Sequence, residues 1–262
     1  MTPDLVALRQ RPIPSCHEAQ ARKRGYRTEV PIMLGGALAS ESCVEVRSIG
    51  LGGDNHYNSV FNPPYHERIP GSIAELFVRQ SVGGKLRDVN ERLAGAGIEI
   101  YLFDAWRPQA VQRYFHDVWF PAWLGKRQPD LVGRALVDEV EKYWSAPTTG
   151  ASSPSPHSTG GAVDLTLRFV STKQSLFMGG LFDDVTADAW TDSLERRARV
   201  SMSDDEACAN RRLLYWTMSE AGFANNPTEW WHFSWGDQMW ARLTGRPAAH
   251  YGSCTPAIAS DD

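Results

Sequence analysis

The chain has 262 residues, of which 42% are hydrophobic and 22% are charged, a balance typical of a globular protein large enough to bury a core without cross-links. Its formal net charge of −4 argues against a nucleic-acid-binding surface, which needs a clustered excess of Lys and Arg. No stretch reaches the ~20 apolar residues of a membrane helix. Neither nucleic acid nor membrane is therefore expected as a partner.

Three parts of the chain differ in composition. Residues 1–27 are polar and rich in Pro and Arg, and they are expected to form an arm that packs on a domain spanning 28–250, with 251–262 as a tail. The basic run Arg22-Lys23-Arg24 predicts a solvated face. The arm lacks the apolar region of a secretory signal, so a cytoplasmic location is expected. None of the four cysteines forms a C-x-x-C pair, which favours reduced thiols.

The first predicted elements precede residue 104. Gly, Asn and Pro dominate residues 50–72, which predicts a loop. Apolar side chains at helical spacing predict a helix over 73–95, and Gly83-Gly84 predicts a break within it. β-Branched and aromatic residues over 98–103 predict a strand.

Three further elements are expected between residues 108 and 156. Pro108 suits the first turn of a helix running to about Trp119. A second helix is expected from about 129 to 144. Ser, Thr, Pro and Gly over 148–156 predict a loop.

Apolar and polar residues alternate again in the last part of the chain. Residues 162–167 and 230–235 predict strands, and the capping box Ser203-x-x-Glu206 predicts a helix that ends at Gly222. The order of elements indicates a single α+β domain with a small antiparallel sheet carrying the site, flanked by helices.

A histidine and a carboxylate stand close together in the sequence SPHSTGGAVD. His157 and Asp164 are joined through a Gly pair that lets the backbone turn back. Zinc accepts imidazole nitrogen and carboxylate oxygen, and a catalytic zinc site keeps three protein ligands plus water. A simple histidine–aspartate hydrogen bond in a loop is the alternative interpretation of this pair.

A second segment, EWWH, would complete such a site. Glu229 and His232 would point to opposite faces of a regular strand, but a bend before Trp230 would let both face one cleft. They would then supply a third ligand and a nearby carboxylate base. A surface glutamate and a core histidine are the alternative.

A third segment, DAWRP, ends the strand predicted over 98–103. Arg107 offers a rigid fork of donors suited to an oxyanion or carboxylate, and Asp104 could hold that fork in place. The alternative is a capping salt bridge.

These segments resemble the D-alanyl-D-alanine dipeptidases of the zinc D,D-peptidase group. Ser155–Asp164 matches the family's S-x-H-x-x-G-x-A-x-D signature and Glu229–His232 its E-x-W-H signature. DAWRP, the segment Met178–Asp183 and the stretch from Asn210 to Phe223 are similar to further family segments in the same order. The resemblance covers roughly residues 28–242.

The resemblance implies a role for each matched residue. One Zn²⁺ per chain is expected on His157, Asp164 and His232, with Glu229 as general base and Arg107 steadying the tetrahedral intermediate. Three residues are expected to contact substrate: Ser155, Asp183 and Asp104. The partner expected is a free dipeptide, which the resemblance implies to be D-alanyl-D-alanine, and the sequence leaves a homo-oligomer open.

Two regions depart from the family's pattern. Asp54-Asn-His-Tyr-Asn58 replaces the usual D-N-F-T-G segment, and the stretch between Arg107 and His157, with Trp119, Trp123 and Trp144, is long. Both are expected to line the substrate cleft. Three alternatives therefore stay open: hydrolysis of another dipeptide-like metabolite, a D,D-carboxypeptidase acting on peptidoglycan stem peptides, and a zinc-binding module without catalysis.

Overall fold

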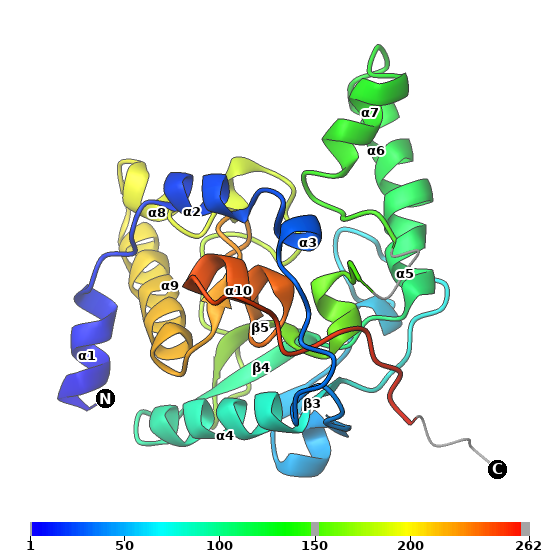
Figure 1. Ribbon diagram of the computed structural model, residues 1–262. Helices are drawn as coiled ribbons and strands as arrows, with labels where there is room; N and C mark the ends of the chain where they lie inside the picture. The colour runs from blue at the N-terminus through cyan, green and yellow to red at the C-terminus, as the bar shows by residue number, and fades with distance from the viewer. Residues whose placement is uncertain (1, 148–151, 258–262) are drawn as a thin grey trace.

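The computed structural model describes residues 2–147 and 152–257. A five-stranded sheet with the order β2-β4-β5-β7-β6 forms its centre (Figure 1). Its strands are β2 (Gly52–Gly53), β4 (Ile98–Asp104), β5 (Ala162–Phe169), β6 (Ala224–Asn225) and β7 (His232–Ser234). A separate two-stranded sheet pairs β1 (Cys43–Glu45) with β3 (Phe77–Arg79). The predicted α+β class is confirmed.

The larger sheet is mixed rather than wholly antiparallel. β2 runs parallel to β4, whereas the β4–β5, β5–β7 and β6–β7 pairs are antiparallel. β2 lies inside the stretch 50–72, which was expected to be loop throughout, because a two-residue strand leaves no alternation to detect. A short 3₁₀ helix, η2 (His56–Asn58), follows it.

The burial of their side chains explains why β4 and β5 form the central strands. In β4, buried Ile98, Ile100 and Leu102 alternate with half-buried neighbours, as expected for a strand with one face on the core. β5 is buried on both faces over its first six residues. The strands predicted over 98–103 and 162–167 are confirmed.

Three helices pack against this sheet. α4 (Gln80–Ala94) lies along β4, α9 (Met202–Glu220) packs on β5 and β6, and α10 (Gln238–Thr244) packs on β6. The predicted break at Gly83-Gly84 is wrong, since α4 is continuous. A Cβ on Gly83 would lie 2.9 Å from the Ile49 side chain, so this glycine allows the close approach of the η1 turn (Val46–Ile49).

Two predicted boundaries near the end of the chain are also displaced. α9 is capped by Ser201, whose hydroxyl accepts a hydrogen bond from the Asp204 amide, so the predicted capping box at Ser203 starts two residues late. The strand predicted over 230–235 is only β7, because the chain turns through Trp230 and Trp231 before it.

The long stretch after β4 forms a helical projection. It comprises α5 (Gln109–Tyr114), the π-helical turn η3 (Phe115–Trp119), α6 (Phe120–Arg127) and α7 (Gly133–Val140). α6 and α7 stand out from the body of the molecule (Figure 1). The helix predicted to stop near Trp119 thus continues into α6. Of the predicted loop 148–156, residues 148–151 lie outside the described residues; the 3₁₀ helix η4 (Pro156–Thr159) follows.

The N-terminal residues form three helices that lie across the domain. α1 (Pro3–Gln10) packs on α9 and buries Leu5 and Leu8 in the main core. α2 (Cys16–Lys23) and α3 (Tyr26–Glu29) lie beside α10 (Figure 1). Two short elements complete the described structure: η5 (Ala187–Ala189) and α8 (Ser193–Arg196). Within the described ranges, no helix has the length and apolarity needed to cross a bilayer.

Candidate active site

A row of polar side chains crosses three strands of the central sheet. Asp104 on β4 pairs with Asp164 on β5, and Asp164 pairs with His232 on β7. Directly paired residues project from the same face of a sheet, so these three side chains meet. The register shifts between Leu102 and Asp104, a bulge that re-aims the end of β4 toward this row.

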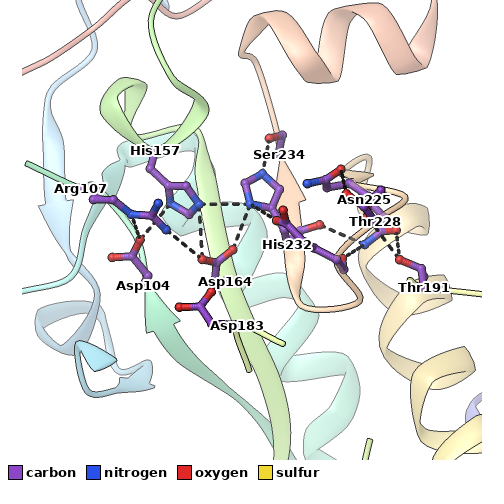
Figure 2. A network of polar contacts seen from close by, with 12 residues as sticks. Asp104, Arg107, His157, Asp164, Asp183, Thr191, Asn225, Thr228, His232 and Ser234 are labelled. Atoms are coloured by element: carbon purple, nitrogen blue, oxygen red, sulfur yellow. Dashed lines mark hydrogen bonds and ion pairs between the residues drawn. The ribbon is translucent and has the colours of Figure 1, made fainter. Parts of the chain in front are cut away.

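His157 reaches the row from η4, just before β5. The turn needs glycines: Gly160 has a φ of 70°, and a Cβ on Gly161 would lie 2.6 Å from the Trp235 carbonyl oxygen. His157 Nε2 consequently lies 3.1 Å from His232 Nδ1 and 3.4 Å from Asp164 Oδ2 (Figure 2).

The donor set of His157, Asp164 and His232 fits a metal ion. Each residue offers one ligand atom, and these atoms lie within 4.8 Å of one another. Tetrahedral zinc with bonds of about 2.0–2.2 Å holds its ligands about 3.3–3.6 Å apart. Asp164 Oδ1 is buried and faces His232 Nδ1 at 3.0 Å. Although burial favours the neutral acid, His157 and His232 hold the pKa of Asp164 well below its usual range, so it is a carboxylate.

Outer partners fix the orientation of both imidazoles. His157 Nδ1 lies 2.7 Å from the Ala105 carbonyl oxygen, which requires a proton on Nδ1 and leaves the Nε2 lone pair facing the row. His232 Nε2 lies 3.2 Å from Ser234 Oγ, and its Nδ1 faces Asp164 at 3.0 Å from Oδ1. The free lone pairs of the two rings thus converge.

Glu229 stands beside this cluster on the turn between β6 and β7. The Glu229 amide donates to the Asn226 carbonyl oxygen and the His232 amide to that of Glu229, which produces the bend expected before Trp230. Glu229 Oε2 lies 3.6 Å from His232 Nδ1 and its side chain is partly exposed. Glu229 therefore lies next to the three-residue cluster without belonging to it.

Arg107 lies beside His157, on the side away from His232, and several partners hold it (Figure 2). The guanidinium donates from Nε to Asp104 Oδ2 at 2.8 Å and from Nη1 to Gln112 Oε1 at 3.1 Å. Its Nη2 lies 3.1 Å from Tyr57 Oη and 3.4 Å from Asp164 Oδ2. Asp104 is fully buried behind Arg107 and does not line the cavity, so its place is to hold the fork rather than to touch a ligand.

Asp183 provides a buried carboxyl group near the row. Its φ of 57° lies in the left-handed region, which Asp tolerates better than most residues. The hydroxyls of Tyr57 and Tyr65 both donate to its Oδ2, at 2.8 and 2.9 Å. Burial, helped by repulsion from Asp164, raises the pKa of Asp183 to about 7.

These groups surround one cavity of about 130 Å³. Arg107, His157, Asp164, Glu229 and His232 line it, and so do Ser155 and Asp183. The sequence-predicted residues therefore come together, with Asp104 behind Arg107 rather than in the cavity wall.

The two regions that depart from the family's pattern behave differently. Trp144 lines the cavity, whereas Trp119 and Trp123 stack with each other in the projection. From the segment 54–58 no side chain lines the cavity; His56 packs edge-on to Phe182, and Tyr57 reaches the site indirectly, through Asp183 and Arg107.

The sequence interpretation missed Tyr65 and Lys23 as parts of the site, and it expected Tyr57 in the cleft wall rather than bonded to Asp183 and Arg107. Lys23 lines the cavity, so the prediction that the whole basic run of the arm is solvated is wrong at this residue. Its neighbours Arg22 and Arg24 are exposed.

Comparisons with known proteins find similar sequences in a single family. The sequence profile described as D-ala-D-ala dipeptidase matches residues 71–248. A D-alanyl-D-alanine dipeptidase of Synechocystis sp. is 37% identical over 155 residues, which are 55% of this chain and 62% of that protein. A D-alanyl-D-alanine dipeptidase of Streptomyces coelicolor is 31% identical, and the match covers 63% of this chain and 77% of that protein. One of Enterococcus faecium is 28% identical, and the match covers 58% of this chain and 70% of that protein. The match thus spans less than two thirds of the Synechocystis relative.

Proposed function

The chain belongs to the D-ala-D-ala dipeptidase family, and from that premise we propose that it is a zinc-dependent peptidase that hydrolyses a free dipeptide, D-alanyl-D-alanine above all. The observation that carries the proposal is the convergence of His157, Asp164 and His232 with a separate carboxylate, Glu229, at one cavity. A binding module would need the first three residues but neither Glu229 nor the braced Arg107.

In the proposed reaction each residue has a distinct task. His157, Asp164 and His232 would hold one zinc ion, which when bound supplies a Lewis acid and lowers the pKa of a coordinated water. Glu229 accepts the proton of the attacking water and returns it to the leaving amine. Arg107 donates to the oxyanion of the tetrahedral intermediate, from a guanidinium already fixed by Asp104 and Gln112.

The size and charge of the cavity favour a dipeptide over a longer peptide. Its volume of about 130 Å³ is small beside the ~300–1,000 Å³ of pockets that hold drug-sized ligands. Asp183 offers a carboxylate to a free ammonium terminus. A D,D-carboxypeptidase acting on stem peptides would instead need the amino side of the cavity open to a chain.

The first test is a panel of dipeptides with the metal controlled. We expect about one zinc per chain by elemental analysis, release of alanine from D-alanyl-D-alanine in preference to the L,L and mixed isomers, and loss of that activity on chelation with recovery on adding zinc. Full activity in demonstrably metal-free protein, or no cleavage of the D,D isomer by the zinc-loaded protein, would refute the proposal.

A second prediction concerns the amino terminus of the substrate and pH. Asp183 must be ionised to pair with an ammonium group, and its raised pKa means that kcat/KM for a free dipeptide rises with pH and falls as the carboxylate is protonated. The midpoint should lie at or below about 7, because a metal cation nearby favours the carboxylate. In Asp183→Asn, kcat/KM for the free dipeptide should change much less with pH between pH 5 and 7.5.

The matched substrate for this prediction is the N-acetyl dipeptide. Without an ammonium group it loses the ion pair with Asp183, which keeps only the hydroxyls of Tyr57 and Tyr65 as partners. Loss of one charge-assisted hydrogen bond costs about 2–3 kcal/mol, so cleavage should fall roughly 30- to 100-fold. Asp183→Asn should bring the rates on the free and the N-acetylated dipeptide closer together. Equal rates on the free and acetylated dipeptides would place the amino end in open solvent and favour the carboxypeptidase.

A further inference from the structure

Lys23 brings a cation from the N-terminal arm into the cavity. It is the last residue of α2 and precedes residues 71–248, the part of the chain that matches the family. Its side chain is partly buried and lines the same cavity as Glu229 and His232. Burying an ammonium group in this way costs hydration free energy, which a binding partner must offset.

Its ammonium group is tied to the turn that carries Glu229. Lys23 Nζ donates to Asn226 Oδ1 at 2.8 Å. The Asn226 carbonyl oxygen accepts from the Glu229 amide, and the Asn226 amide donates to the His232 carbonyl oxygen. Lys23 is thereby fixed on the Glu229 side of the cluster, whereas Asp183 is bound from the side of Tyr57 and Tyr65.

Lys23 and Arg107 line the cavity and are both at least partly buried, and of these two cations Lys23 has more donors to spare. Arg107 directs its guanidinium at Asp104, Gln112, Tyr57 and Asp164. Lys142 is largely exposed and bonded to Glu139. Asn226 is the single hydrogen-bond partner of the Lys23 ammonium within the described part of the chain, and an ammonium group has three donors.

The local electrostatics favour an anion at this point. Burial lowers the pKa of Lys23, and the nearby Glu229 carboxylate offsets that effect only in part. An incoming carboxylate would replace the hydration that the ammonium lost and use its remaining donors. Asp183 presents the opposite charge elsewhere in the same cavity, so the cavity offers one group to each end of a zwitterion.

We propose that Lys23 binds the C-terminal carboxylate of the dipeptide, with Asp183 at the other end taking the ammonium. This inference rests on the proposed function and names the arm residue that selects substrates ending in a free carboxylate.

The test compares D-alanyl-D-alanine with its C-terminal amide, which has the same scissile bond but no carboxylate. The wild-type protein should prefer the free acid. Lys23→Met should lower the ratio of kcat/KM on acid to that on amide by about 10- to 100-fold, the effect of losing one charge-assisted hydrogen bond. The loss should fall mainly on KM for the acid and leave the amide almost unchanged, and Lys23→Arg should keep most of the preference.

Arg22→Met is the matched control, because it removes the same charge from the exposed face of the same helix and should leave the ratio as in the wild type. Zinc content and the thermal unfolding midpoint verify that each variant is folded. If Lys23→Met slows acid and amide equally, Lys23 acts through Glu229 or the fold, and the inference is overturned while the proposed function stands. If the wild-type protein hydrolyses neither substrate, the proposed function itself fails and the inference with it.

Discussion

Replacing Glu229 with glutamine is expected to lower kcat by at least ~100-fold while the protein keeps its zinc. The amide has the shape of the carboxylate and can keep the same contacts beside His232, but it cannot accept a proton from water. The three proposed ligands, His157, Asp164 and His232, are untouched by the change. Steady-state kinetics on D-alanyl-D-alanine and elemental analysis of the same preparation measure the two halves of the prediction.

The two measurements separate a base from a ligand. Loss of zinc from Glu229→Gln would make Glu229 a ligand, because a base lies outside the coordination sphere. Retained zinc with normal turnover would mean that another group removes the proton. Asp184 also lines the cavity, so Asp184→Asn is a suitable control and should retain most of the activity.

The second large effect is expected for Arg107→Lys, with kcat reduced about 10²- to 10³-fold and KM changed much less. A lysine keeps the charge but cannot reproduce the guanidinium fork, whose three nitrogens bind Asp104, Gln112 and Tyr57 at once. An ammonium tied to Asp104 would stop short of the positions that Nη1 and Nη2 occupy, so its remaining donors would not reach the oxyanion.

Arg168→Lys provides a control on the same sheet. Arg168 is paired with Glu99 toward the other end of β5, where its Nε lies 2.6 Å from Oε1, and its replacement should leave kcat unchanged. Thermal unfolding of both variants distinguishes loss of chemistry from loss of fold. Near-normal kinetics in Arg107→Lys would reduce Arg107 to a structural role in bracing the end of β4.

The parts of the fold that could be predicted are those with a repeating local signal. β4 and β5 were located because their apolar side chains follow the strand period over at least six residues. β2 could not be found, because it is two residues long and depends on pairing with β4. The break predicted at Gly83-Gly84 failed because local propensity favoured it, whereas packing against Ile49 requires a glycine in a continuous helix.

The site residues likewise divide into those in short sequence motifs and those brought in from distant parts of the chain. His157, Asp164, Glu229 and His232 stand in two short segments whose spacing carries their chemistry. Tyr57 and Lys23 lie far from both segments in the sequence, and no local pattern connects them to Asp183 or Asn226. Their contacts arise only when η2 and α2 pack against the domain. A single sequence holds little record of such long-range contacts.

The position of α2 separates the choice of substrate from the cleavage of the peptide bond. The reacting groups stand on or beside the strands of the central sheet, whereas part of the cavity wall comes from the arm and from Glu141–Ser145, which follow the helical projection. Neither outer segment supplies a residue to the row of Asp104, Asp164 and His232. The choice of substrate can therefore drift during evolution, or be redirected by mutagenesis at Lys23 and its surroundings, without rebuilding the machinery that breaks the bond.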